Sequence, residues 1–277
     1  MKITVATFNM LYEAHYQRYA TVETMPALQR LQLQKTVLAD LAARCDVLFF
    51  QECHFGGDDF KTIAPSHTFV RANARDRETC AIAFNHATFR MDGTPVVNAF
   101  RDARSGRSLP KCTLSVFLVP TEGQPIPVCM TCCHAPWAPS AAGRAAVVDQ
   151  IASCVDPSTC FPGACVVAGD FNVDSSDTAA FTALTRAGFE DQSTTDGPTV
   201  ISARGTFDKI DFVFARGFAR SAEPAQRVPA DPFSLIRHVP LAASAVACHT
   251  ASSKQPELPF ADFPSDHAAV LTTLVLP

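Results

Sequence analysis

Short apolar runs follow one another along the chain, and most of them end at a polar group. Their β-branched and aromatic content predicts buried strands. The predicted strands are Ile3 to Asn9, Asp46 to Phe50, Cys80 to Asn85, Thr88 to Val97, Cys112 to Val119, Ile126 to Cys133, Ala164 to Ala168, Phe207 to Ala215 and Ala268 to Leu276. Many strands with few helices between them predict two sheets packed face to face, with helices on the outer faces.

Three segments have the spacing of apolar residues that is typical of helices. They are Ala27 to Arg44, Ser140 to Val155 and Thr178 to Ala187. Ser140 is the expected N-cap of the second helix, and Gly188 follows the third as a C-terminal signal. The sequence also predicts two loops, which are a polar loop from Arg101 to Lys111 and a long proline-rich loop from Ala222 to Pro264.

Length and composition are consistent with one large domain over residues 1–277, because 47% of the residues are hydrophobic. The formal charge of -4 argues against tight non-specific binding to long nucleic acid, but it is compatible with a nucleic acid substrate that is bound through a few phosphates. No apolar stretch reaches about 18 residues, and the N-terminus opens directly into a strand pattern. We therefore expect an intracellular, cytoplasmic protein that does not insert into a membrane.

Many of the 11 cysteines lie inside apolar runs, which is typical of reduced, buried thiols. Cys129 and Cys132 have the spacing of a zinc motif. On a strand, however, residues three apart point to opposite faces, and no second pair of this spacing is present. The pattern therefore disfavours zinc.

The candidate chemistry lies in polar motifs where the predicted strands end. In chain order they are Thr7-Phe8-Asn9, Gln51-Glu52, His134, Gly169-Asp170-Phe171-Asn172, Lys209-Ile210-Asp211 and Ser265-Asp266-His267. Carboxylates, amides and two imidazoles delivered to one rim suit a hard divalent cation and a phosphate. The set favours a metal-dependent phosphoesterase.

Each residue also has a purely structural interpretation. Glu52 is either a direct Mg²⁺ ligand, or a solvated strand end or a helix-cap partner. Asn9 either holds a metal-bound water or satisfies backbone groups in a turn. Asp170 and Asn172 either handle the attacking water or shape a turn.

The two histidines have alternatives of the same kind. His134 is either a core histidine or a donor to a phosphate oxygen. Ser265-Asp266 either simply caps or turns the chain, or it places His267 against the scissile phosphate with a buried carboxylate to orient the ring. Asp211 is the first candidate for that carboxylate. Asp208 ranks second because it would lie on the other face of a regular strand.

Weaker signals concern substrate binding. Arg101, Arg104, Arg107 and Lys111 form the one local basic cluster, which holds flanking phosphates or is simply a solvated loop. Pro139 and Phe207 are weak candidates for stacking on a base.

These motifs resemble the endonuclease/exonuclease/phosphatase superfamily over nearly the whole chain. The resemblance implies a four-layered α/β sandwich of the DNase I type and Mg²⁺-dependent hydrolysis of a phosphate ester, with Mn²⁺ able to substitute. It also implies that Asn9, Glu52 and Asp266 serve the metal and that Asp170 and Asn172 handle the water. His134 and the pair of His267 and Asp211 match residues that act on the phosphate.

Several segments are most similar to the deadenylase and nocturnin branch, so an RNA or nucleotide substrate attacked from its 3′ end is expected. They are Thr7 to Leu11, Cys80 to Phe84, His134 with Trp137 and Pro139, and Ile210 to Phe214. The chain lacks a leucine-rich repeat docking region, and we expect a monomer. Alternatives are a lipid or inositol phosphate phosphodiesterase similar to neutral sphingomyelinases, a DNA-repair phosphodiesterase, and an inactive binding module on the same fold.

Overall fold

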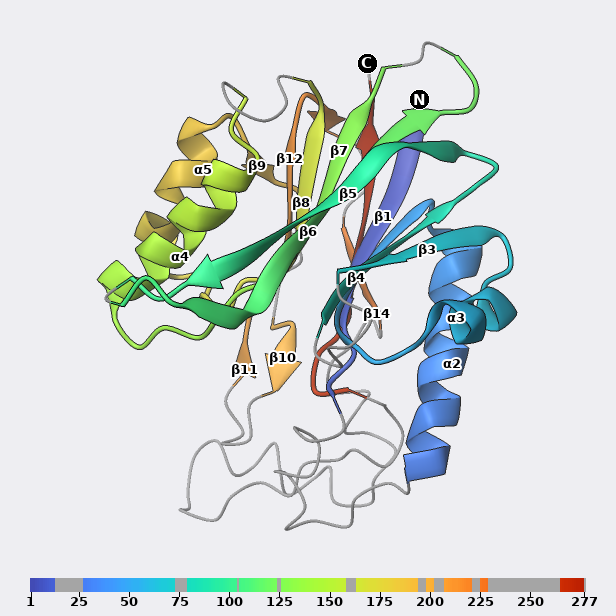
Figure 1. Ribbon diagram of the computed structural model, residues 1–277, viewed down its shortest axis with the longest axis horizontal. Coiled ribbons are helices and arrows are strands. Elements are labelled where there is room, and N and C mark those ends of the chain that lie inside the picture. Colours follow the sequence, from blue (N-terminus) through green and yellow to red (C-terminus); the bar gives the residue numbers. More distant parts are fainter. Residues whose placement is uncertain are drawn as a thin grey trace.

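Two β-sheets face each other, and helices cover the outer face of each sheet (Figure 1). The structure, a computed structural model, describes residues 1–12, 27–72, 79–103, 105–123, 126–157, 163–193, 198–201, 207–220, 225–228 and 265–276. Among the described helices, none has the length and apolar content needed to cross a bilayer. Most of the proline-rich segment from Ala222 to Pro264 lies outside the described residues.

The first sheet is built around the two ends of the chain. Its order is β13-β15-β1-β2-β4-β3, with β14 also paired to β15. The strands are β1 (Lys2–Asn9), β2 (Val47–Cys53), β3 (His67–Arg71), β4 (Thr79–Asn85), β13 (Ala219–Arg220), β14 (Gln226–Val228) and β15 (Ala269–Val275). β1 pairs antiparallel with β15 and parallel with β2. The parallel pair needs a crossover, and helix α2 (Ala27–Arg44) lies within it.

The second sheet has the order β5-β6-β7-β8-β12-β9. Its strands are β5 (Phe89–Arg101), β6 (Ser108–Pro120), β7 (Val128–His134), β8 (Cys165–Asp170), β12 (Asp211–Arg216) and β9 (Glu190–Asp191). β7 and β8 run parallel and are joined through helix α4 (Ala141–Cys154), whereas β12 is antiparallel to β8. A separate ribbon consists of β10 (Val200–Ile201) and β11 (Phe207–Asp208).

Three hydrophobic layers hold the sandwich together. Between the sheets, Val5 and Phe49 pack in one cluster with Val116 and Met130. Leu38 and its neighbours on α2, together with α3 (Gly57–Ile63), cover the first sheet. α4, the 3₁₀ turn η2 (Thr178–Phe181) and α5 (Thr182–Arg186) cover the second. The predicted four-layered α/β sandwich is therefore confirmed.

Strand direction explains why the polar motifs meet. β1 runs parallel to β2, and β7 runs parallel to β8. The carboxyl ends of all four strands lie at one end of the sandwich. β12 and β15 run the opposite way, so their first residues lie at that same end. Register places Asp170 beside both His134 and Asp211.

Some predicted elements differ from the structure. The polar loop is shorter than expected, because β5 extends to Arg101 and β6 begins at Ser108. The strand expected from Phe207 to Ala215 is interrupted at Lys209 and Ile210, which separate β11 from β12. The third predicted helix is a 3₁₀ turn followed by the short α5.

The thiols follow the expected pattern. The nine cysteines in the described part of the chain form no disulfide. Cys129 faces the outer cluster under α4, whereas Cys132 faces the core between the sheets. The prediction that they point to opposite faces is confirmed.

Candidate active site

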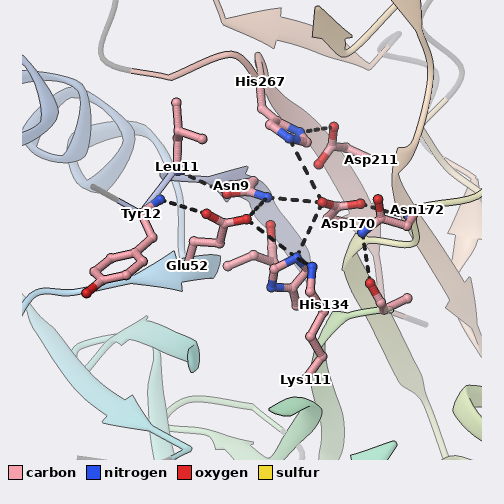
Figure 2. Close-up of polar contacts among 12 residues, drawn as sticks. Asn9, Leu11, Tyr12, Glu52, Lys111, His134, Asp170, Asn172, Asp211 and His267 are labelled. Atoms are coloured by element: carbon pink, nitrogen blue, oxygen red, sulfur yellow. Dashed lines mark hydrogen bonds and ion pairs between the residues drawn. The ribbon is translucent and has the colours of Figure 1, made fainter. Parts of the chain in front are cut away.

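One amide group connects the two carboxylates at the centre of the candidate site. The Nδ2 atom of Asn9 donates to Oδ2 of Asp170 at 3.0 Å and to Oε1 of Glu52 at 3.4 Å (Figure 2). Asn9 comes from the first sheet and Asp170 from the second, so this contact joins the two sheets. All three side chains are buried. Two buried carboxylates repel each other unless positive charge lies close by, and the site therefore favours a cation.

The backbone around these groups is strained. Among the described residues other than glycine, only Leu11, Glu52 and Asn172 have left-handed backbone, with φ of 54°, 53° and 49°. This conformation is unfavourable for Leu and Glu, which keep it only where the surroundings fix it, whereas Asn adopts it more readily. At Glu52 it coincides with a bulge in β2. All three residues border the candidate site, which indicates that the fold fixes its geometry.

Backbone amides hold the first two site residues in place. The N–H of Leu11 donates to Oδ1 of Asn9 at 3.0 Å, and the N–H of Tyr12 donates to Oε2 of Glu52 at 2.7 Å. The left-handed turn at Leu11 brings both donors inward. Oε1 of Glu52 is the oxygen that faces Asn9 and His134.

Helix α2 supports this turn through a buried guanidinium. Arg30 donates through one terminal nitrogen to the carbonyl oxygens of Met10, at 3.1 Å, and Leu11. Gln34 donates to the Met10 carbonyl at 2.8 Å. Both polar side chains lie on the buried face of α2, at helical spacing with Leu38. Sequence reasoning missed them, although polar residues within an apolar stripe were the available signal.

The segment after β8 forms a turn. The N–H of Asn172 donates to Oδ1 of Asp170 at 2.8 Å, and its side-chain amide donates to the carbonyl of Ala135 at 2.8 Å. Phe171 packs behind the turn against Phe212, with ring centroids 5.6 Å apart. Burial raises the pKa of Asp170, while the charges of His267 and Lys111 oppose that rise. Asp170 and Asn172 therefore shape a turn, in which the backbone of Asn172 is left-handed.

His267 and Asp211 form a buried pair opposite Asp170. Nδ1 of His267 lies 2.9 Å from Oδ2 of Asp211, and its Nε2 lies 3.9 Å from Oδ2 of Asp170. Burial works against protonation of His267, but the charges of Asp211, Asp266 and Asp170 outweigh it and raise its pKa to about 10. Oγ1 of Thr199 accepts a hydrogen bond from the backbone N–H of Asp211 at 3.1 Å, and this contact fixes the start of β12.

His134 meets a lysine at the site. Nε2 of His134 lies 3.6 Å from Oε1 of Glu52 and 3.7 Å from Oδ2 of Asp170. The ammonium of Lys111, near the start of β6, contacts the same Nε2 atom. An ammonium can only donate, so this contact makes Nε2 an acceptor. The positive group that faces the carboxylates here is therefore Lys111.

The donor set fits a hard divalent cation. Glu52 and Asp170 offer carboxylate oxygens, Asn9 lies between them, and Asp266 is close by with its Oδ1 atom 3.7 Å from Nε2 of His267. Mg²⁺ prefers oxygen ligands of this kind and retains several waters. Ligand atoms of Asp170, Asp211 and His267 also lie within 4.8 Å of one another. That trio suits a metal less well, because Oδ2 of Asp211 and Nδ1 of His267 are already paired with each other at 2.9 Å.

A cleft of about 540 Å³ opens beside these groups. It is lined by Trp137, Ala138, Pro139, Arg144, Asn172, Asp174, Ser176, Asp177, Val200, Asp208, Ile210, Asp266 and His267. Trp137 is 71% exposed. Asp208 lines this cleft, whereas the contact to Nδ1 of His267 is made by Asp211.

The weaker predicted residues are placed differently. Lys111 reaches the site and Pro139 lines the cleft. Arg101 and Arg107 are exposed, and Arg101 donates to the carbonyl of Gly106 within its own loop. Arg104 lies outside the described residues, as does the side chain of Phe207.

Comparisons with known proteins agree with this architecture. The sequence profile described as the Endonuclease/Exonuclease/phosphatase family matches residues 6–267. A search of curated proteins by sequence finds no significant match.

Solved structures with the same fold share little sequence with the chain. An endonuclease/exonuclease/phosphatase family protein from Bacteroides thetaiotaomicron is 15% identical, with a TM-score of 0.66 over 100% of this chain and 98% of that chain. The human nocturnin catalytic domain, with bound sulfate, is 13% identical, with a TM-score of 0.67 over 100% and 95%. ANGEL2, a 2′,3′-cyclic phosphatase in complex with adenosine-2′,3′-vanadate, is 13% identical, with a TM-score of 0.62 over 99% and 95%.

Proposed function

The chain belongs to the endonuclease/exonuclease/phosphatase family, and from this premise we propose that it is an Mg²⁺-dependent phosphodiesterase acting on RNA or a nucleotide. Members of the family hydrolyse phosphoric esters. The observation that carries the proposal is the placement of two buried carboxylates, Glu52 and Asp170, opposite the imidazolium of His267. Such an arrangement suits a cation and a phosphate together.

The metal is assigned to one part of the site. Glu52 would be its direct ligand, with Asn9 and Asp266 acting through water, and Mn²⁺ would substitute. A bound divalent cation neutralises charge on the phosphate and on the leaving oxygen.

The remaining residues act on water and on the phosphoryl group. Asp170 accepts a proton from the attacking water, and its raised pKa makes it a better base. Asn172 orients that water. The imidazolium of His267 donates to a phosphoryl oxygen, and Asp211 holds the ring in the required orientation. Lys111 adds positive charge and is placed by His134. The P–O ester bond then breaks, and the leaving oxygen takes up a proton from solvent, while Asp170 later returns the proton of the attacking water to solvent.

The nucleotide preference rests on two lines of support. The segments around His134, Trp137 and Pro139 and from Ile210 to Phe214 are similar to the deadenylase branch. Among proteins of the same fold, ANGEL2 is described in complex with adenosine-2′,3′-vanadate. We therefore propose removal of nucleotides from a 3′ end.

A substrate panel tests this proposal. Bis(p-nitrophenyl) phosphate first establishes phosphodiester hydrolysis in Mg²⁺, in Mn²⁺ and in excess chelator. Oligo(A) with a free or a blocked 3′ end, single-stranded DNA, sphingomyelin and inositol phosphates then identify the substrate. We expect hydrolysis of oligo(A) that requires a free 3′ end. Hydrolysis of sphingomyelin without activity on RNA or nucleotides would contradict the proposed substrate and would assign the protein to another branch of the family.

A further inference from the structure

We propose that the cleft beside the reaction centre binds an uncharged planar group of the substrate, aromatic or heteroaromatic, with Trp137 as its stacking surface. This inference rests on the proposed phosphodiesterase function. It adds the chemical class of the group that is attached to the scissile phosphate.

The cleft is continuous with the reaction centre. His267, Asn172 and Asp266 belong to the candidate active site and also line the cleft. A phosphate held between His267 and Glu52 would therefore extend one of its ester groups into this space. The volume of about 540 Å³ lies within the range of pockets that enclose small organic ligands.

Trp137 provides the apolar surface of the cleft. It is the only tryptophan in the sequence, and 71% of its surface is exposed. The segment that carries it is held at both ends. The carbonyl of Ala135 accepts from the amide of Asn172 at 2.8 Å, and the carbonyl of Pro139 accepts from Arg144 at 3.3 Å. An exposed indole on a backbone segment that is held at both ends suits stacking on a flat ring.

The charges that line the cleft disfavour a second phosphate. Nε of Arg144 lies 2.6 Å from Oδ2 of Asp177, so this cation is already neutralised. Asp174 and Asp208 line the same cleft. Carboxylates repel an additional phosphate but accept hydrogen bonds from an amino group on a ring. The expected occupant is thus an uncharged end of the substrate.

Non-hydrolysable phosphonates test the inference, with hydrolysis of bis(p-nitrophenyl) phosphate as the assay. Phenylphosphonate should inhibit about tenfold more strongly than methylphosphonate, because ring stacking adds to phosphonate binding. Benzene-1,4-diphosphonate should inhibit less strongly than phenylphosphonate, because its second phosphonate meets the carboxylates. Phenylphosphonate should also change the fluorescence of the single tryptophan.

Variants separate stacking from general effects. Trp137→Ala should reduce the ratio of the two inhibition constants to near one, and Trp137→Phe should keep most of it. Leu28→Ala is the control, because Leu28 is an exposed apolar residue on α2 and does not line the cleft. This variant should leave the ratio of the two inhibition constants unchanged. A ratio near one in the unmodified protein, or a ratio that survives Trp137→Ala, would overturn the inference alone. If bis(p-nitrophenyl) phosphate is not hydrolysed in either metal, the proposed function fails and the inference with it.

Discussion

Glu52 combines burial, a left-handed backbone and a carboxylate whose second oxygen is already fixed by the N–H of Tyr12. If this carboxylate is the metal ligand, Glu52→Gln should reduce kcat by roughly 10³-fold or more and weaken binding of Mn²⁺. The fold should persist, because Gln has nearly the same shape. Kinetics, electron paramagnetic resonance of bound Mn²⁺ and circular dichroism measure these effects. Full activity of the unmodified protein in excess chelator would refute the assignment.

His267 and Asp211 should behave as one unit. His267→Ala and Asp211→Ala should each lower kcat by roughly 10²–10⁴-fold, and the double variant should lose little more than the worse single variant. The physical reason is that Asp211 acts through the ring it orients at 2.9 Å. Steady-state kinetics of the unmodified protein, the two single variants and the double variant measures the coupling energy between the two side chains. Losses that multiply would show that the two side chains act independently.

The negative charge of Asp211 should also determine how kcat depends on pH, because it affects the pKa of His267. His267 has a pKa raised to about 10, so it is protonated at neutral pH and loses its proton as the pH rises through that value. Removing a neighbouring negative charge lowers this pKa. In Asp211→Asn, the alkaline fall in kcat should therefore begin at a lower pH than in the unmodified protein. Asp208→Asn is the control, and a shift in that variant instead would favour Asp208 as the partner.

At the scale of elements, α2 acts as a support for the metal side of the site. Arg30→Met removes the buried donor to Met10 and Leu11, and so frees the turn that presents the N–H of Tyr12 to Glu52. We expect weaker binding of Mn²⁺ together with a lower kcat, and partial rescue in Arg30→Lys. Arg44→Met, on the exposed part of the same helix, is the matched control. Unchanged Mn²⁺ affinity in Arg30→Met would contradict this role.

The parallel pair of β7 and β8 approaches too closely for a side chain at Gly169. A Cβ atom there would lie 1.9 Å from the carbonyl oxygen of Cys133. Gly169→Ala should therefore lower the free energy of unfolding by about 3 kcal/mol, through displacement of the strand end that carries Asp170. Gly57→Ala, where the new methyl group meets no atom within 4 Å, should have little effect. Chemical denaturation of both variants provides the comparison.

Elements that bury apolar residues were predictable, and elements held mainly by pairing were not. β1, β2 and β8 are apolar runs, so their polar ends could be found in the sequence. Most of β5 is exposed, and β6 holds it by backbone pairing. No hydrophobic pattern marks that part, and the extension to Arg101 was therefore missed.

The residues of the candidate site divide in the same way into those that could be predicted from the sequence and those that could not. Which residue types lie at strand ends is local information, and it was sufficient to select Asn9, Glu52, Asp170 and His267. The contact of Lys111 with His134 and the support from Arg30 depend on packing between distant segments. Such contacts leave little trace in one sequence beyond a polar residue on an apolar face.

At the scale of the whole molecule, the net charge of -4 bears on substrate binding. We expect few phosphates to be neutralised, because Lys111 alone reaches the site among the members of the predicted basic cluster that the structure describes. The plot of log(kcat/KM) for oligo(A) against log salt concentration should have a slope of roughly −2. Lys111→Met should make the slope shallower by about 0.7. A much steeper slope would indicate an extended phosphate-binding track.

The pairing of β1 with β15 has a consequence for how the protein is made. Residue 2 is paired with residue 275 in the interior of a sheet, and the hydroxyl of Ser265 donates to the carbonyl of Asn9 at 2.7 Å. During translation, β1 leaves the ribosome before its antiparallel neighbour β15 and cannot form this pairing until residues 269–275 have emerged. A nascent chain without residues 265–276 has neither that strand nor His267. Hydrolytic activity should consequently emerge only after residues 265–276 have left the ribosome, so a shorter nascent chain cannot act on RNA close to its own site of synthesis.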